Sequence, residues 1–355
     1  MKWIMGEAVR NLASGTTKPV RFTLLFSVAV LVIGLGDALT VQRYMEEAIH
    51  YRDSGAATVT VVSPGQINGN SCDKLVTIPS IMAAGALRQD DESLVSTVLP
   101  KGAIASYSVT EGALSVFQTS DSKTVGVVVS TTVANTLGVS PGQTVPLTIG
   151  QTEVRGQFDW PNDGRRPGFD FAILTPITGD ELFDECWIKA WPVPENIQVL
   201  LRLVIDNTTG DTTAKIDYSQ VNTSLGAHFT GVERYSSRIS QVAPLLIFVV
   251  AVLLGLVMVW VRRLELATAQ HVGAPLFAQA VQLLMEYGIC IVIGGGIVLG
   301  IDTAVVLFLP QLDHSALYDI LIKCFGCGVC GGIVGVVLAV CAISPKQLFR
   351  YFKTH

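Results

Sequence analysis

Charged residues are scarce in this chain of 355 residues. Asp, Glu, Lys and Arg make up 15% of it, whereas about 25% is usual for a soluble globular domain. Half of the residues are hydrophobic, and the mean hydropathy is +0.49. This deficit of charge favours several membrane spans over one oversized soluble core. The formal net charge of −5 argues against a nucleic-acid partner.

Motifs for ATP binding and for enzyme catalysis are also lacking. No GxxxxGK[ST] sequence occurs, which excludes ATP binding by a P-loop in this chain. No Gly-x-Ser-x-Gly or Cys–His arrangement offers a nucleophile. The histidines are scattered and form no metal cluster: His50, His228, His271, His314 and His355. We therefore predict no catalytic residue, no metal site and no cofactor in this chain.

Long apolar runs are what the sequence has instead. At about 1.5 Å per residue, a run of roughly 20 residues crosses the hydrocarbon core of a bilayer. We predict four transmembrane helices: the first with its stalk at 22–51, the second at 241–261, the third at 276–309 and the fourth at 318–343. The fold class expected is an α-helical membrane protein with an inserted extracytoplasmic α+β domain of two subdomains, at 52–240.

The distribution of charge fixes the expected orientation. Nine basic residues fall in the predicted inner segments: Lys2, Arg10, Lys18, Arg21, Arg262, Arg263, Lys346, Arg350 and Lys353. The acids there are Glu7 and Glu265. By the positive-inside rule, both termini are cytoplasmic and the inserted domain is extracytoplasmic. We expect a multi-pass protein of the cytoplasmic (inner) membrane.

The N-terminal segment 1–21 resembles a short amphipathic helix lying on the cytoplasmic surface of the bilayer. Ile4, Val9 and Leu12 are near helical spacing, with Glu7 and Arg10 between them. A cleaved signal peptide is the alternative, and Gly36-Asp37-Ala38 is the nearest match to a cleavage site. At the other end, 344–355 is predicted to be a basic cytoplasmic tail.

Alternating strands and helices are expected in the inserted domain. We predict a strand at Ala57–Ser63, a helix at Ile78–Arg88, a strand at Leu94–Leu99, a strand at Leu114–Gln118, a strand at Val199–Ile205, a helix at Thr212–Leu225 and a strand at His228–Glu233. The strand at Leu114–Gln118 belongs to a β-rich insertion, expected at about 102–190 between the two mixed α/β ends of the domain. Gly and Pro turns separate its short strands.

A basic turn joins the second and third apolar runs. Arg262, Arg263 and Glu265 come first, and His271, Gly273 and Ala274 follow close to the next helix. We predict a cytoplasmic coupling turn at 262–275. The alternative is an ordinary inner loop without a role.

The order of these features resembles the permeases of the MacB/FtsX type. The residues of the hairpin that carry the resemblance are Arg263, Glu265, Leu266, Ala267, Gly273, Ala274, Glu286, Gly294, Gly295, Gly296 and Gly300. Those of the inserted domain are Gly142, Val145, Leu147, Val154 and Gly156. The lead Glu7–Leu12 and the tail Pro345–Arg350 also resemble this family, although Leu348 and Phe349 depart from the usual closing signature.

This resemblance implies a permease subunit of an ABC-type transporter. A separate ATPase subunit, which would hold ATP and Mg²⁺, docks on the Arg262–Ala274 turn and the N-terminal helix. A second permease chain, identical or different, packs through the first two spans. ATP-driven motion of the ATPase would be transmitted to the extracytoplasmic domain and would expel an antibiotic, a peptide or a lipid-like molecule. The alternative is an FtsX-like signalling protein that regulates cell-wall hydrolases. An extracytoplasmic adaptor or hydrolase would be a further partner.

Acidic residues within the apolar runs require a reason, because burying a carboxylate in a bilayer is costly. Asp37 lies near the outer end of the first span and Glu286 lies early in the third. Each is a candidate for substrate contact or coupling. The alternative for both is a structural bond between helices.

The cysteines fall into two sets. Cys72 and Cys186 are the cysteines of the outer segment, and an even pair in an oxidising compartment predicts a disulfide. The run Cys324-x-x-Cys327-x-x-Cys330 has the spacing of a metal-ligand motif, but it lies in an apolar, Gly-rich segment. We interpret this run as small residues for close helix packing.

Overall fold

The computed structural model describes residues 6, 10–11, 14, 18–121, 125–148, 150–206, 216–308 and 314–343. Most of the expected N-terminal helix and the whole basic tail lie outside these residues. The chain divides into two compact units, one of residues Met1–Glu46 with Thr230–His355 and the other of Glu47–Phe229. We describe each unit by itself.

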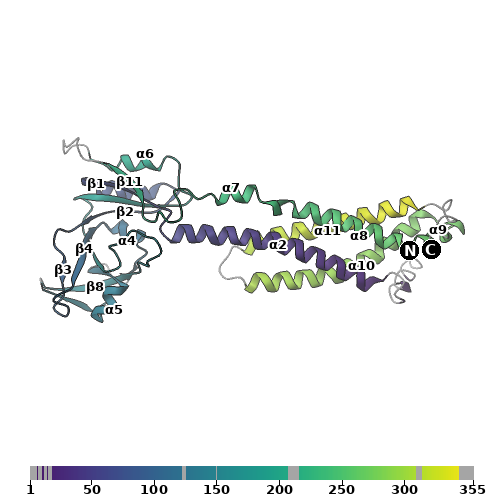
Figure 1. Cartoon of the computed structure of the whole chain (residues 1–355), viewed down its shortest axis with the longest axis horizontal. Helices are drawn as coiled ribbons and strands as arrows, with labels where there is room; N and C mark the ends of the chain where they lie inside the picture. The colour runs from purple at the N-terminus through teal and green to yellow at the C-terminus, as the bar shows by residue number, and fades with distance from the viewer. Residues whose placement is uncertain are drawn as a thin grey trace. The chain divides into compact units, whose positions relative to one another are not determined.

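Four long helices make up the first unit. They are α2 (Pro19–Asp53), α8 (Ala243–Trp260), α10 (Leu276–Phe308) and α11 (His314–Ala342), as Figure 1 shows. Each is long and apolar enough to cross a membrane, α8 together with the short segments α7 (Gly231–Ser236) and η3 (Ile239–Val242) before it. The chain is therefore a helical multi-pass membrane protein whose first and second spans are separated by an inserted domain.

Two of these helices extend beyond the ranges expected from hydropathy. α2 begins at Pro19, a residue that suits the first helical position because it needs no amide donor there. It continues through a polar stretch to Asp53, and its residues from Glu47 belong to the second unit. α11 begins at His314 rather than at 318. A hydropathy scan locates apolar segments, and it does not detect the polar turns that extend a helix beyond them.

Glycines bring α8 and α11 into backbone contact. A Cβ atom on Gly331 would overlap the carbonyl oxygen of Phe248, and one on Gly335 would overlap that of Val252. Gly255, on α8, faces the backbone of Gly332 in the same way. Small residues in membrane helices allow this close approach, which packs the two helices at van der Waals distance.

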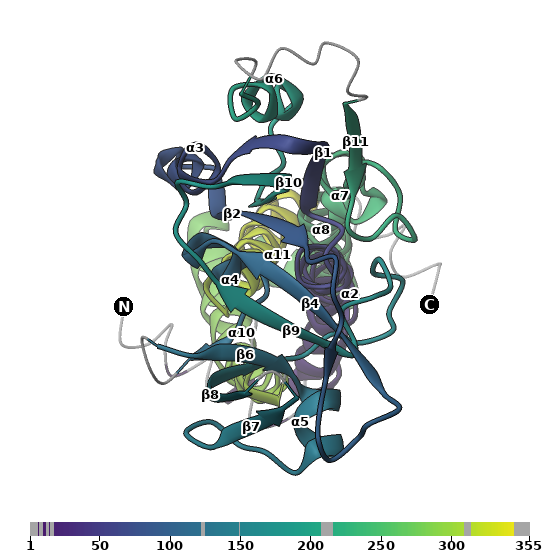
Figure 2. The same ribbon diagram turned by 90° about the vertical axis from the view of Figure 1, so that its left-hand side faces the viewer.

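One mixed sheet forms the centre of the second unit. Its strand order is β11-β1-β10-β2-β4-β9-β6-β8-β5, with β3 beside β4 and β7 beside β8 (Figure 2). The strands are β1 (Thr58–Asn68), β2 (Ile81–Gln89), β3 (Leu94–Val95), β4 (Ala103–Val109), β5 (Ser120–Asp121), β6 (Val127–Ser130), β7 (Thr144–Leu147), β8 (Gly150–Phe158), β9 (Ala172–Pro176), β10 (Leu182–Ala190) and β11 (Asp217–Gln220). The β4–β9 and β6–β8 pairs are parallel and the others are antiparallel.

Short helices cover the sheet. They are α3 (Gly69–Lys74), η1 (Leu75–Thr77), α4 (Glu111–Val116), α5 (Thr131–Leu137) and α6 (Ile197–Arg202). The Asn68 side chain caps α3 by accepting a hydrogen bond from the Ser71 amide at 2.9 Å. A disulfide between Cys72 and Cys186 joins α3 to β10, and this pair is the one that the sequence singles out. The bond fixes the helix to the core that β1, β2 and β10 share.

The structure corrects three segments of this unit. Ile78–Arg88 was expected to be a helix, but most of it is the central strand β2, between β10 and β4. Its Ala- and Gly-rich run allows α4 to lie directly on it, since a Cβ on Gly85 would overlap the backbone of Ala113. Leu114–Gln118 lies largely in helix α4, and Val199–Ile205 lies largely in helix α6, instead of strands. Packing on the sheet overrides the local propensity in each case.

The end of the inserted domain also differs from the expectation. Within the expected helix Thr212–Leu225, the described residues 216–225 contain strand β11 and no helix, and residues 207–215 lie outside the description. His228–Glu233 contains the start of helix α7 rather than a strand. Strand β10 belonged to the expected insertion at 102–190, yet it pairs with both β1 and β2. The sheet is therefore continuous across that boundary, because the pairing of β10 is non-local.

Candidate functional site

The turn between α8 and α10 contains a helix of its own. Residues 262–275 were expected to be a turn, but Arg263–His271 form helix α9. Helix-favouring residues such as Leu264 and Ala267 supply the reason, and Glu265 in the first turn complements the helix dipole. Gly273 follows with φ +101°, a backbone conformation that glycine adopts without strain. Pro275 then precedes α10.

A buried ion pair binds this helix to α10. Arg262 Nη1 lies 2.6 Å from Glu286 Oε2, and the Glu286 side chain is 0% exposed. Glu286 Oε1 accepts hydrogen bonds from Asn11 Nδ2 at 3.0 Å and from Gln282 Nε2 at 3.3 Å. One carboxylate therefore binds the start of α9, its own helix and a residue of the N-terminal segment.

Glu265 accepts hydrogen bonds from the other two nitrogens of the Arg262 side chain. Nε and Nη2 of Arg262 donate to the two carboxylate oxygens of Glu265 at 3.0 and 2.7 Å. Burial lowers the pKa of Arg262, but the hydrogen bond to Glu265 and the charge of Glu286 outweigh this effect, so the net direction is upward. Arg262 is therefore a fixed cation between two carboxylates, and Glu265 keeps half of its side chain exposed.

Further contacts attach α9 to the bundle along its length. Gln279 of α10 donates to the carbonyl of Leu266 at 3.1 Å and accepts from Gln270 at 3.0 Å. Leu266 and Ala267 are buried in a cluster that α8, α10 and α11 share. Helix α9 is thus part of the folded bundle rather than a loose loop.

The residues that follow α9 include exposed apolar side chains. Val272 is 83% exposed and Phe277 is 77% exposed, with Leu276 beside them. Glu265 and His271 are exposed polar neighbours on α9. We call Val272, Leu276 and Phe277 the apolar tip. Exposed apolar groups rimmed by polar residues are typical of a protein-docking or membrane-surface site.

The predicted site residues separate into two places. Arg262, Glu265 and Glu286 come together, and α9 carries Arg263 and His271, with Gly273 and Ala274 just beyond it. Asp37 lies elsewhere in this unit, where its Oδ1 is 3.1 Å from Nε of Arg238. The sequence analysis missed Asn11, Gln279 and Arg238. A lone Arg just before an apolar run could have indicated Arg238 as the partner of the intramembrane Asp37.

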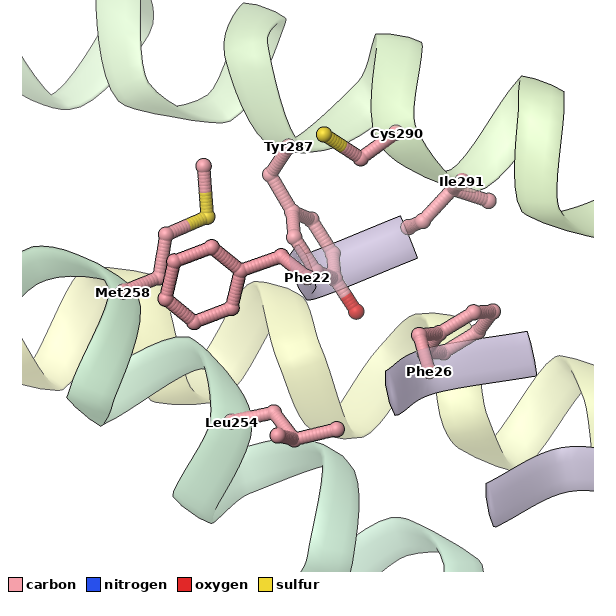
Figure 3. A pocket seen from close by; sticks show the side chains of 7 residues that line it. All are labelled: Phe22, Phe26, Leu254, Met258, Tyr287, Cys290 and Ile291. Atoms are coloured by element: carbon pink, nitrogen blue, oxygen red, sulfur yellow. The ribbon is translucent and has the colours of Figure 1, made fainter. Parts of the chain in front are cut away.

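An apolar pocket lies between α2 and the hairpin helices. Its volume is small, about 10 Å³, and it is lined by Phe22, Phe26, Leu254, Met258, Tyr287, Cys290 and Ile291. In Figure 3, the ring of Phe22 of α2 lies beside Met258 of α8, and the ring of Tyr287 points away from α10 into the space between the helices. Tyr287 is next to Glu286 in the chain, and its hydroxyl donates to the carbonyl of Gly328 at 3.4 Å.

Helix α11 separates the members of the cysteine run. Cys324 is buried, Cys327 is half-buried and Cys330 is exposed. Among the residues that the structure describes, no group of three or more His, Cys, Asp or Glu side chains is arranged to hold a metal ion. The glycines of the same run, Gly331 and Gly335, make the close contacts with α8.

Comparisons with known proteins gave structural similarities only. No protein-family model and no curated protein matches the chain. The periplasmic region of MacB from Actinobacillus actinomycetemcomitans is 14% identical with a TM-score of 0.35, covering 48% of this chain and 92% of its own. A domain of a putative permease protein from Porphyromonas gingivalis is 11% identical with a TM-score of 0.31, covering 46% and 87%. The extracellular domain of the noncanonic ABC-type transporter YknZ from Gram-positive bacteria is 14% identical with a TM-score of 0.31, covering 46% and 100%.

Proposed function

We propose that this chain is the permease subunit of an ABC-type transporter and that a separate ATPase docks on α9 and the apolar tip. The observation that carries the proposal is the construction of α9. Its start is fixed to the membrane bundle by the buried Arg262–Glu286 pair, and exposed apolar residues, Val272 and Phe277, follow its end and are free to contact a partner. The resemblance of the hairpin to MacB/FtsX-type permeases supports the same function.

In this proposal, the ATPase moves the bundle through α9. A force applied to α9 reaches α10 through Glu286 and Gln279, because both side chains are buried and bonded to α9 or to Arg262 just before it. α8 and α11 then move as a pair, since their backbones interlock at Gly331 and Gly335. Coupling by packed elements of this kind needs no conformational change within the helices.

The first span provides the route to the inserted domain. α2 is continuous from Pro19 to Asp53. Within the second unit, Tyr51 packs on Trp191 and Phe229, and its hydroxyl donates to the carbonyl of Gly226 at 3.2 Å. The end of α2 is thereby fixed to the inserted domain, which we propose to be extracytoplasmic and to act on the exported antibiotic, peptide or lipid-like molecule. A second permease chain completes the transporter, and its ATPase partners bind ATP and Mg²⁺.

The test uses two changes in the α9 segment with matched controls elsewhere. Glu265→Lys places a cation beside Arg262, and Gly273→Val forces a branched side chain into a positive-φ position. Glu92→Lys makes the same charge change on an exposed residue of the inserted domain. Gly138→Val makes the same backbone change at the glycine after α5, which has φ +65° and open space around it.

The chain is purified from its native membrane with the proteins that remain bound to it, and ATPase turnover of the complex is measured. We expect an ATPase to accompany the wild-type chain and both control variants. Glu265→Lys and Gly273→Val should insert normally and reduce ATPase recovery or turnover about tenfold or more. If no ATPase accompanies the wild-type chain, or if all four variants behave alike, this function is wrong.

A further inference from the structure

One face of α11 is exposed along nearly the whole length of the helix. The opposite face packs on the rest of the bundle through buried residues such as Leu321, Cys324 and Val336. The exposed residues recur at helical spacing, so they form one continuous stripe. They are Asp319, Lys323, Gly326, Cys330, Ile333 and Val337. We call these six residues the exposed α11 face.

Two opposite charges lie at the beginning of this face. Asp319 and Lys323 are one helical turn apart, and both residues are exposed. Within the part of the chain that the structure describes, neither takes part in a salt bridge. Lys323 directly precedes the apolar run 324–342, which at about 1.5 Å per residue has roughly the length of the hydrocarbon core. The two charges therefore lie at the membrane boundary, where an ion pair is stronger than in bulk water.

Small residues continue the exposed α11 face into the apolar part of the helix. A Cβ atom on Gly326 would meet no described atom within 4 Å, so the backbone is open to a close neighbour there. Cys330, one turn further on, is an exposed free cysteine. Gly331 and Gly335, by contrast, are already in contact with α8. Small residues one turn apart allow another membrane helix to approach closely.

The order of the two charges indicates which partner fits this face. Two copies of the chain inserted with the same orientation are related by a twofold axis along the membrane normal, so their α11 helices run parallel. Gly326 then lies at the same depth as Gly326 of the partner subunit. Lys323 lies one turn, about 5.4 Å, along the axis from Asp319 of the partner subunit, and a lysine side chain spans that distance. The face is therefore complementary in charge to itself, with two ion pairs per dimer.

We propose that the exposed α11 face binds a second copy of this chain. Gly326 and Cys330 lie where the two helices touch, and the reciprocal ion pairs close the contact at the membrane boundary. This contact rests on the proposed function, which includes a second permease chain, and adds that the second chain is identical and binds through α11. The resemblance to the MacB/FtsX type implies the first two spans instead. Association is measured on the chain alone, so a failure here would leave the coupling at α9 untouched.

The first experiment measures dimerisation of the full chain in detergent micelles by sedimentation equilibrium. Lys323→Glu and Asp319→Lys each place like charges opposite one another. The double variant Asp319→Lys/Lys323→Glu exchanges the charges and forms the pairs again. We expect the wild-type chain and the double variant to dimerise with similar affinity. Each single variant should dimerise about tenfold more weakly, because two attractions become two repulsions.

A matched pair of glycine variants tests the contact between the helices. Gly326→Leu fills the open position on α11, and Gly300→Leu fills an equally open and exposed position on α10. Neither new Cβ would meet a described atom of the chain within 4 Å, so we expect both variants to fold. Gly326→Leu should be monomeric at concentrations at which the wild-type chain and Gly300→Leu are dimeric.

Native Cys330 reports the contact in the membrane itself. Cys341→Ser first removes the other exposed cysteine of α11. Oxidation of these membranes with copper phenanthroline should then join two copies by a disulfide between their Cys330 side chains. Adding Cys330→Ser should abolish this product and leave the dimer in micelles intact, since serine is also small.

Three results would overturn the proposal. A wild-type chain that is monomeric in micelles and is not cross-linked in membranes would mean that the two charges face only lipid head groups and water. A double charge variant as weak as the single variants would mean that Asp319 and Lys323 do not pair across the dimer. A dimer that tolerates Gly326→Leu and both charge reversals would form through another face, such as the first two spans.

Discussion

Two arginines each hold a buried carboxylate of the membrane unit. Arg262 binds Glu286, which joins the segment before α9 to α10, and Arg238 binds Asp37, which lies far away in the sequence. A buried carboxylate without its cation is strongly destabilising, whereas replacing a whole pair by apolar residues is often tolerated. This asymmetry allows the structural and functional roles of the Arg262–Glu286 pair to be separated.

We expect Glu286→Ala to destabilise the chain by less than about 3–5 kcal/mol, the cost of an unpaired buried charge, because Arg262 loses one carboxylate and keeps Glu265. The double variant Arg262→Met/Glu286→Met should recover most of this loss. Thermal unfolding in detergent, followed by loss of monodisperse protein, measures both. If the double variant is stable and ATPase turnover of the complex is still lost, the pair acts in coupling as well. An unfolding temperature unchanged by Glu286→Ala would contradict the prediction.

Asp53, at the end of α2, gives a pH-dependent prediction. The hydrogen bond from Arg52 lowers the pKa of Asp53 against the opposing effect of burial, and the charges of Arg52 and Lys189 lower it further. Because the pKa is lower in the folded chain, the stabilisation is present above the unfolded pKa of about 3.9. It is lost as the pH falls through the folded value.

The unfolding temperature of the wild-type chain should therefore fall as the pH is lowered below about 4. Asp53→Asn should reduce this fall and lower the unfolding temperature at neutral pH. Asp91→Asn, on an exposed residue, is the control and should leave the profile unchanged. Identical profiles for the two variants would show that Asp53 does not contribute.

Backbone contact fixes the pairing of α8 with α11 at the scale of the elements. Gly335 has no room for a side chain, since a Cβ would overlap the carbonyl of Val252. Gly296, on α10, has open space around it. Both positions are glycines within apolar helices, so the sequence alone does not distinguish them.

We expect Gly335→Ala to destabilise the chain by at least about 1–3 kcal/mol, the usual cost of overpacking. Gly296→Ala should be neutral or slightly stabilising, because alanine favours the helix. The unfolding temperatures of the two variants in the same detergent provide the comparison. Equal values would mean that α8 and α11 separate easily, which would exclude their movement as a pair.

The orientation in the membrane belongs to the scale of the whole molecule. Asn162 is an exposed residue of the inserted domain, and Thr268 is an exposed residue of α9. If the positive-inside rule holds, an impermeant thiol reagent should label Asn162→Cys in intact cells. It should label Thr268→Cys only after permeabilisation. The unmodified chain measures the background from its own free cysteines, and the reverse pattern would contradict the proposed orientation.

The sequence by itself determined the features that depend on composition and short-range periodicity. Apolar length located the four spans within a few residues, since hydropathy is a property of each segment alone. Candidate residues such as Arg262, Glu265 and Glu286 were visible because a charge in or beside an apolar run is unusual. The even pair Cys72 and Cys186 was visible for a similar reason.

The tertiary structure decided which of these residues meet. Helix α9, strand β2 and the short helices α4 and α6 were missed because packing against distant elements outweighs a propensity of less than about 1 kcal/mol per residue. The position of β10 between β1 and β2 depends on pairing across more than a hundred residues, which no local pattern encodes. The joining of Arg238 to Asp37 and of Asn11 to Glu286 likewise depends on how the helices pack, because each contact joins segments that are adjacent only in the folded bundle.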